Sequence, residues 1–194
     1  AVGRTATTNV THVLLIDNTL SMTDQAPKAQ SSFPNCFEQA KARVEDLANA
    51  AVRSNSPQTF IVMTLDQPDV PLFHDKLNED SVAQLRKRLA DLKPTHAHLD
   101  ANVGLEACKK QLGNLKESKR WLHLLSDFRD HDWGYGPANE KLHAPLTEIA
   151  ATGTQIALID CAVPPRAGQG RSLEYHNNFA ITDFRPEKRV APAG

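Results

Sequence analysis

The chain contains four short runs of consecutive apolar residues, separated by longer segments in which apolar residues recur every three or four positions. Continuous apolar runs of this length are typical of strands buried on both faces, and the longer period is typical of amphipathic helices. The predicted strands are residues 11–17, 58–65, 121–125 and 155–161, and the predicted helices are residues 35–53, 79–92, 99–115 and 141–151. A short edge strand is also predicted at 70–73, where Pro68 and Pro71 limit its length.

The order of these elements indicates an α/β fold. Strands that alternate with helices favour a mostly parallel central sheet with helices on both faces, a Rossmann-like three-layer sandwich. Residues 11–163 are expected to form this domain, after an N-terminal arm at 1–10. The segment 164–194 is expected to be a C-terminal extension, either the last strand of the same sheet or a linker into a following β-domain, because part of it alternates in hydrophobicity.

Oxygen-bearing side chains follow the first predicted strand directly. Asp17 ends the apolar run, and Thr19 and Ser21 come at alternate positions behind it. Open parallel sheets bind ligands at the carboxyl ends of their strands, so these three side chains are expected to face one small space. A carboxylate with two hydroxyls suits Mg²⁺, Mn²⁺ or Ca²⁺ and does not suit zinc or copper. The alternative is a strand-to-loop junction at which the hydroxyls only form turns.

The same stretch resembles the first metal-binding loop of a von Willebrand factor A (vWA) domain. The metal-ion-dependent adhesion site of that family begins Asp-x-Ser-x-Ser, and here the residues are Asp17-x-Thr19-x-Ser21. Met22 follows them, as is common in bacterial members. The motif is short and therefore a weak signal by itself, but its position after a four-residue apolar strand makes the resemblance more specific.

A second strand end extends the resemblance. The family's third loop follows an apolar strand that ends in Ser-Asp-Gly, and the third predicted strand here ends in Ser126-Asp127, with Phe128 in place of the glycine. Two acids that each follow a predicted strand and lie about 110 residues apart, Asp17 and Asp127, are a much more specific signal than either one alone. With the order of strands and helices included, the resemblance covers about residues 10–163.

The second loop of the family site is the least similar. The family supplies a threonine shortly before a helix, in a pattern like Gly-Thr-x-Leu-x-x-Ala-Leu. When Leu99 and the run 103–105 set the register here, the threonine position falls on Ala97. Thr95 lies two residues earlier and is the candidate for that role. The sequence therefore leaves two alternatives open, a working metal site and a vWA fold whose site has decayed into a metal-independent scaffold.

The resemblance implies a protein-interaction module and not an enzyme. The cofactor would be a divalent cation, Mg²⁺ or else Mn²⁺ or Ca²⁺, with one position open for an Asp or Glu side chain of another protein. Its expected ligands are Asp17, Thr19, Ser21, Asp127 and Thr95. The expected partner contacts are His98, Trp133 and Tyr135. For the two aromatic residues, the alternative is packing within their own loop.

Segment 17–22 and the C-terminal tail are most similar to the membrane-anchored Bat-type (aerotolerance-related) group of bacterial vWA proteins. The resemblance therefore implies the extramembrane part, periplasmic or in the cell envelope, of a membrane-anchored bacterial protein. No run of residues in the sequence approaches the length of a membrane-spanning helix. The balance of 22 basic and 23 acidic residues gives no electrostatic case for binding nucleic acid or an anionic membrane.

Other kinds of site use the same residue types. Haloacid-dehalogenase-type phosphatases also place an aspartate at the end of a first strand, so Asp17 is the candidate nucleophile of a phosphohydrolase, although Thr19 stands where that motif has its second acid. A histidine metal site rests on composition alone, and its candidates are His96, His98, His123 and His131. Of the three cysteines, Cys108 and Cys161 are expected to be buried, and Cys36 is a candidate for exposure.

Overall fold

The computed structural model describes residues 9–25, 32–97, 99–115, 119–133 and 140–163. The strands are β1 (Val10–Ile16), β2 (Gln58–Thr64), β3 (Phe73–Lys76), β4 (Lys119–Ser126) and β5 (Gln155–Asp160). The α-helices are α1 (Cys36–Val52), α2 (Glu79–Asp91), α3 (Ala101–Gly113), α4 (Asp130–Trp133) and α5 (Glu140–Ala151), and a short 3-10 helix, η1, spans Leu20–Thr23. None of the helices in these ranges is long and apolar enough to cross a membrane.

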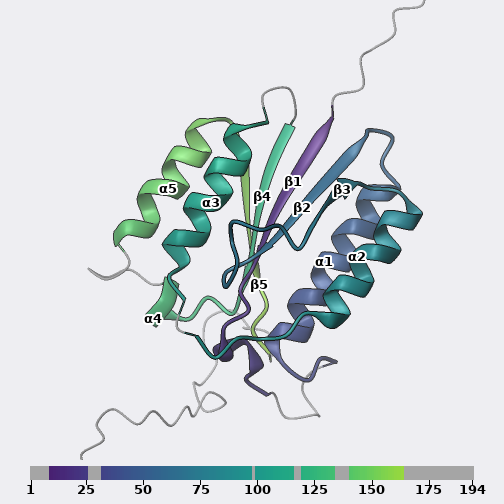
Figure 1. Cartoon of the computed structure of the whole chain (residues 1–194). Coiled ribbons are helices and arrows are strands. Elements are labelled where there is room, and N and C mark those ends of the chain that lie inside the picture. The colour runs from purple at the N-terminus through teal and green to yellow at the C-terminus, as the bar shows by residue number, and fades with distance from the viewer. Residues whose placement is uncertain (1–8, 26–31, 98, 116–118, 134–139, 164–194) are drawn as a thin grey trace, which may run out of the picture.

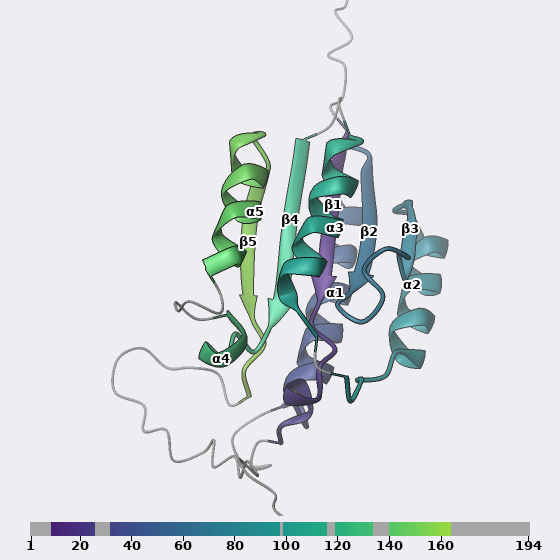
Figure 2. The ribbon, with the colours of Figure 1, turned by 60° about the vertical axis from the view of Figure 1, so that its left-hand side comes forward.

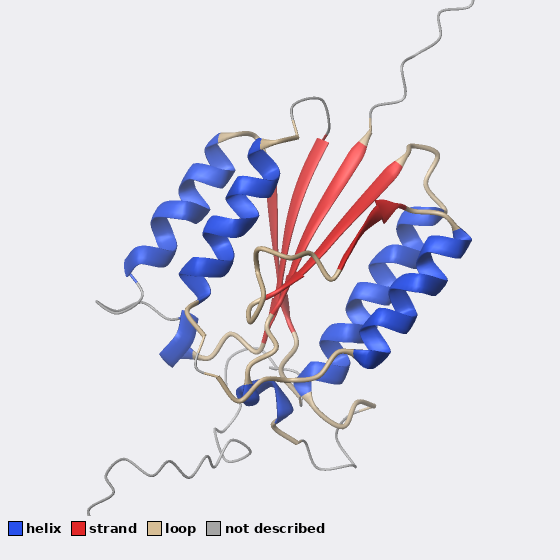
Figure 3. Ribbon diagram, in the orientation of Figure 1, coloured by secondary structure: helices blue, strands red, loops and turns tan. Residues whose placement is uncertain are grey.

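The strands form one sheet in the order β3-β2-β1-β4-β5. β1 pairs in parallel with β2 and β4, β4 pairs in parallel with β5, and only β3 runs antiparallel, beside β2. Helices α1 and α2 cover one face, and α3 and α5 cover the other (Figures 1 and 3). The predicted fold class, an α/β sandwich with a mostly parallel central sheet, is confirmed.

Two apolar layers hold the helices against the sheet. Alternate residues of β1 point to opposite faces, so Leu14 and Ile16 pack toward α1 and α2, while Val13 and Leu15 pack toward α3 and α5. All four side chains are essentially inaccessible to solvent. Figure 2, turned from the first view, shows the strands spread side by side, with α3 and α5 in front of the sheet and α1 behind it. Burial on both faces explains the continuous apolar runs from which β1, β2 and β4 were predicted. β5 is an edge strand without a fully buried residue, in spite of its apolar run.

Local signals in the sequence set the ends of the helices. The side chain of Asn35 accepts a hydrogen bond of 2.9 Å from the backbone N–H of Glu38 and so caps α1. Asn78 and Ser81 form a reciprocal capping box at the start of α2. Behind α5, Gly153 takes a φ of +79°, a left-handed conformation that glycine adopts without steric cost.

Three local predictions differ from the structure. The edge strand lies at Phe73–Lys76 and not at 70–73, because three of its four residues are exposed and polar and so give no apolar signal. Cys36 is buried, since it is the first residue of α1 and packs into the core. The predicted loop after Asp127 contains the short helix α4. The expected C-terminal extension and most of the N-terminal arm lie outside the described residues, so the predicted domain limits stay a prediction.

The topology places the loops after β1 and β4 side by side. The chain leaves β1 toward β2 and leaves β4 toward β5, so the strand order reverses between these two neighbours. In open α/β sheets, ligands bind at such a reversal, outside the carboxyl ends of the strands. Figure 1 shows this end of the sheet at the bottom of the molecule, next to α4.

Candidate functional site

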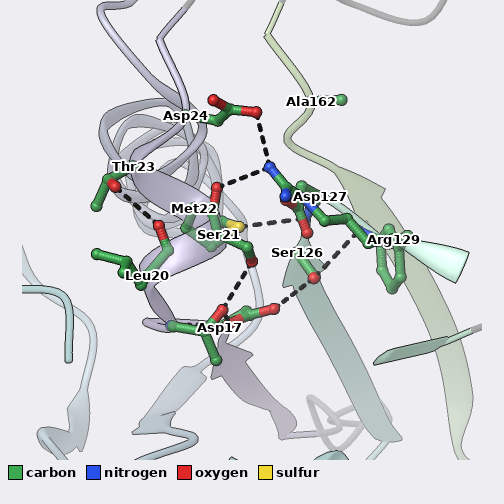
Figure 4. A network of polar contacts seen from close by, with 12 residues as sticks. Asp17, Leu20, Ser21, Met22, Thr23, Asp24, Ser126, Asp127, Arg129 and Ala162 are labelled. Carbon is green, nitrogen blue, oxygen red and sulfur yellow. Dashed lines mark hydrogen bonds and ion pairs between the residues drawn. The ribbon is translucent and has the colours of Figure 1, made fainter. Parts of the chain in front are cut away.

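The first loop (residues 17–24) folds around the carboxylate of Asp17. This side chain is 3% exposed, and its Oδ1 accepts hydrogen bonds from the backbone N–H and the hydroxyl of Thr19, at 2.9 and 2.6 Å. The Thr19 hydroxyl also lies 2.9 Å from the hydroxyl oxygen of Ser21, at the start of η1. The three oxygen-bearing side chains predicted for this loop therefore lie together at the end of β1. Figure 4 labels two of them, Asp17 and Ser21.

The third loop (residues 127–129, following β4) joins the same cluster. Ser126 Oγ donates a hydrogen bond of 2.6 Å to Oδ2 of Asp17, and the backbone N–H of Asp127 donates to the sulfur of Met22 at 3.2 Å. Phe128, which stands where the vWA pattern has glycine, takes a φ of +43°. The chain thus keeps a turn that suits glycine, at a conformational cost of about 1–2 kcal/mol for another residue.

Arg129 connects the third loop to the first. Its Nε donates to Oδ2 of Asp127 at 2.6 Å, and its Nη2 donates to Oδ2 of Asp24 at 2.8 Å and to the backbone carbonyl of Ser21 at 3.2 Å. These contacts are drawn as dashed lines in Figure 4. Neither Arg129 nor Asp24 was predicted from the sequence as a site residue. The available signal was a basic residue two positions after a strand-end acid.

The charges in this cluster are unequal. The cluster holds three carboxylates, those of Asp17, Asp24 and Asp127, and one guanidinium, which pairs with Asp24 and Asp127, so two formal negative charges are left uncompensated. Burial raises the pKa of the Asp127 carboxyl, the nearby Arg129 guanidinium offsets part of that rise, and the charge on Asp17 adds to it. The site is therefore electronegative and contains its own cation.

The second loop (residues 92–100) touches the first through Asn18. The backbone carbonyl of Asn18 accepts a hydrogen bond of 2.7 Å from the N–H of Thr95, and its side-chain oxygen accepts one of 3.2 Å from Asp66. Asn18 is fully buried, so it ties the loops after β1, β2 and α2 together. The hydroxyl of Thr95, however, accepts from the backbone N–H of Ala97 at 3.2 Å. Thr95 lies next to the first loop through its backbone, and its hydroxyl forms a local turn.

These observations test the fit of a divalent cation. Two oxygens that bind one octahedral Mg²⁺ at about 2.0–2.1 Å lie about 2.9 Å apart, and the Thr19 and Ser21 hydroxyl oxygens have this separation. A hydrogen bond has the same length, so the loop keeps its shape without an ion. The first loop therefore fits a cation, while Asp127 already binds Arg129. A cation would be held mainly by Thr19, Ser21 and Asp17.

The predicted partner contacts have different outcomes. Trp133 lies in α4 and packs edge-on against Phe128, with ring centroids 5.3 Å apart and an angle of 69° between the ring planes. It is also partly buried against the core, which agrees with packing inside its own loop. His98 and Tyr135 lie outside the described residues. Leu20, which the sequence analysis did not select, is 49% exposed on η1 beside the cluster.

Among the described residues, the histidines form no metal site of the expected kind. His123 pairs with His12, with 2.9 Å between the ring nitrogens, on the face of the sheet that α1 covers. In the part of the chain that the structure describes, no three His, Cys, Asp or Glu side chains gather in a way that suggests a metal site. Burial raises the pKa of Cys36 to about 11 and that of Cys108 and Cys161 to about 12, so these thiols stay protonated.

No family model matches the chain, and no curated protein matches it either. Among solved structures, it is similar to the conserved hypothetical protein BatB from Bacteroides thetaiotaomicron, at 17% identity and a TM-score of 0.53, over 77% of this chain and 65% of that one. It is also similar to a von Willebrand factor type A structure from Catenulispora acidiphila, at 13% identity and a TM-score of 0.53, over 78% of this chain and 33% of that one. The chain has the von Willebrand factor A fold.

A third vWA-like structure is the manganese-loaded TRAP protein of Plasmodium vivax. The identity is 12% and the TM-score 0.54, and the match covers 78% of this chain and 56% of that one. In each of these three matches, the chain spans less than two thirds of the length of the solved structure. At these identities the likeness concerns the fold, and it confirms the fold that the sequence resemblance implied.

Proposed function

We propose that this vWA domain is a protein-binding module that uses the loops at the carboxyl end of its sheet. The observation that carries the proposal is the meeting of Asp17, Thr19 and Ser21 with Ser126 and Asp127, from two loops far apart in the sequence, at the point where the strand order reverses. The exposed side chain of Leu20 beside them supplies apolar contact area. No residue of this cluster is proposed to act in catalysis.

The ligand proposed for this surface is an Asp or Glu side chain of another protein, held through a divalent cation. The two uncompensated negative charges of the cluster would repel a carboxylate that arrived alone. A bound Mg²⁺ or Mn²⁺ would neutralise those charges and supply a Lewis-acidic position for the carboxylate. Thr19, Ser21 and Asp17 would hold the ion, while Thr95 and Asp127 serve mainly to position the neighbouring loops.

The setting proposed for the domain is a Bat-type, membrane-anchored bacterial protein. The likeness to BatB and to other vWA structures supports this setting through the fold. In this proposal the domain is the extramembrane part of a longer chain and recruits another protein there. A phosphohydrolase that uses Asp17 is the less favoured function, because both oxygens of that buried carboxylate already accept hydrogen bonds.

Nuclear magnetic resonance tests the proposal with a defined carboxylate. The ¹⁵N-labelled chain would be titrated with N-acetyl-aspartate amide in the presence of Mg²⁺, and separately with N-acetyl-asparagine amide, which has the same shape without the charge. The proposal predicts saturable shifts of the first-loop amides with the aspartate compound only. Ser21→Ala is expected to abolish them, whereas Ser54→Ala, at the opposite end of α1, is expected to leave them unchanged. Equal responses to the two compounds would contradict the proposal.

A further inference from the structure

The position of Arg129 resembles that of a bound cation more than that of an ordinary surface arginine. Its guanidinium lies between an acid of the third loop, Asp127, and two oxygens of the first loop, from Asp24 and the backbone of Ser21. All three acceptors are oxygens. Asp24 and Ser21 lie 105 and 108 positions before Arg129 in the chain, whereas Asp127 lies two positions before it. The guanidinium therefore crosslinks two loops by gathering oxygens around one positive charge.

The ion pair of Arg129 is less exposed to solvent than an ion pair on the outer surface of the same molecule. Arg86 of α2 pairs with Glu45 of α1 on the outer helical surface, where the two side chains are 54% and 31% exposed. The side chain of Arg129 is 27% exposed, and that of its partner Asp127 only 5%. Exposed pairs contribute little, whereas a buried carboxylate needs a charged partner. Arg129 thus compensates a charge that the third loop cannot leave to solvent.

This arrangement has a consequence for any ion at the first loop. A guanidinium stays charged at all relevant pH values, so it cannot withdraw by losing a proton. A divalent cation that binds Oδ2 of Asp127 competes with the Nε–H of Arg129 for that oxygen, and an ion held by Thr19 and Ser21 meets the repulsion of a neighbouring positive charge.

We propose that Arg129 is a resident cation of this site, which holds the first and third loops together without metal and limits the affinity for a divalent ion. The inference rests on the proposed function, in which that ion binds at the first loop. It assigns to one residue both the spacing of the two loops without metal and a limit on the affinity of the first loop for a divalent ion. The isolated domain would therefore keep the geometry of its loops in the presence of a chelator.

The test is Mn²⁺ binding to the full chain, measured by calorimetry and by the electron paramagnetic resonance of free Mn²⁺. Arg129→Gln removes the positive charge, Arg129→Lys keeps it and loses the planar fork, and Arg86→Gln is the matched control on the outer surface. The expected result is at least tenfold tighter Mn²⁺ binding in Arg129→Gln, with Arg129→Lys and Arg86→Gln within about threefold of the unmodified chain.

Unchanged or weaker Mn²⁺ binding in Arg129→Gln would overturn the inference, because the guanidinium would then only position the loops or stabilise the fold. If that variant is unfolded without metal, Mn²⁺ is expected to restore its far-ultraviolet circular dichroism, and failure to do so counts against the inference. Binding by Arg129→Gln but not by the unmodified chain supports the inference and contradicts cation-dependent carboxylate capture. Equal Mn²⁺ binding by Arg129→Gln and by the unmodified chain contradicts the inference about Arg129 and supports cation-dependent carboxylate capture. The two proposals are therefore contradicted by different results.

Discussion

Ser126 Oγ donates a hydrogen bond of 2.6 Å to Oδ2 of Asp17, across 109 positions of the sequence. Ser126 is 0% exposed and Asp17 is 3% exposed, so water does not compete for this bond. Ser126 is the last residue of β4, and Asp17 directly follows its neighbour β1. The bond therefore fixes the spacing of the first and third loops before any ligand arrives.

Ser126→Ala is expected to lower the free energy of unfolding by about 1–3 kcal/mol, because it removes a donor from a buried carboxylate. Urea titration followed by circular dichroism measures the change. Ser54→Ala, at an exposed position after α1, is the matched control and is expected to stay within about 0.5 kcal/mol. A loss below that limit in Ser126→Ala would mean that the bond does not contribute to holding the two loops together.

The close contact between α3 and the sheet predicts opposite effects at two glycines. A Cβ on Gly104 would lie 2.5 Å from a methyl carbon of Leu65 and 3.0 Å from one of Leu15. Gly104→Ala is therefore expected to lose about 1–2 kcal/mol in spite of its better helix propensity. At Gly113 a Cβ would meet nothing within 4 Å, and Gly113→Ala is expected to gain up to about 1 kcal/mol. Denaturant melts that rank the two variants the other way would contradict this packing.

The histidine pair in the sheet predicts a loss of stability in mild acid. Burial, and then the neighbouring His12, lower the pKa of His123 to about 4, and burial also lowers the pKa of His12, against its hydrogen bond to Gln58. The pKa of His123 is thus lower in the folded chain than in the unfolded one. As the pH falls from about 6.5 to about 4, only the unfolded chain takes up this proton, so the free energy of unfolding decreases.

For His123 that loss is about 3–4 kcal/mol at most, since each pKa unit between about 6.5 and about 4 corresponds to about 1.4 kcal/mol. Urea melts at pH 7 and pH 4.5 measure it in the unmodified chain and in His123→Leu, which is expected to show a smaller decrease. His74→Leu, at an exposed position of β3, controls for the loss of a histidine. The same decrease in His123→Leu as in the unmodified chain would show that other groups cause it.

The left-handed backbone at Phe128 predicts a difference between two truncations. Both Phe128→Ala and Phe128→Gly remove the ring that packs on Trp133, but only glycine relieves the φ of +43°. The glycine variant is expected to be more stable than the alanine variant by about 1 kcal/mol. Thermal unfolding of the two variants side by side measures this difference. An alanine variant of equal or greater stability would argue against strain in the third loop.

The sequence predicts the central strands and most helices well because their signals are local. β1, β2 and β4 are largely buried, and β5 is a partly exposed edge strand, yet all four read as apolar runs. Asn35 and Gly153 mark helix ends by their own chemistry. The position of β3 was not predicted correctly because it is an exposed edge strand whose only buried side chain is Phe73. Its position depends on pairing with β2, which the sequence does not display.

In the candidate site, too, the residues with a local sequence signal were predicted and those that depend on the fold were not. Asp17, Thr19 and Ser21 form a short motif that predicts its own geometry, and the strand-end position of Asp127 predicts that it joins them. Arg129 reaches Asp24 and Ser21 only through the fold, so a sequence pattern gives no reason to pair them. The backbone hydrogen bond between Thr95 and Asn18 likewise depends on the fold, because the two residues lie far apart in the sequence.

Thermal unfolding in chelator and in Mg²⁺, Mn²⁺ or Ca²⁺ tests most directly whether the first loop binds a cation. An ion that binds only the folded chain adds about 2.7 kcal/mol at 100 times its dissociation constant. For a chain of this length that corresponds to a rise of roughly 5–10 °C in Tm. We predict such a rise with Mg²⁺ or Mn²⁺ and its loss in Ser21→Ala. No rise with any of the three ions, or an equal rise in Ser21→Ala, would contradict a cation site on the first loop.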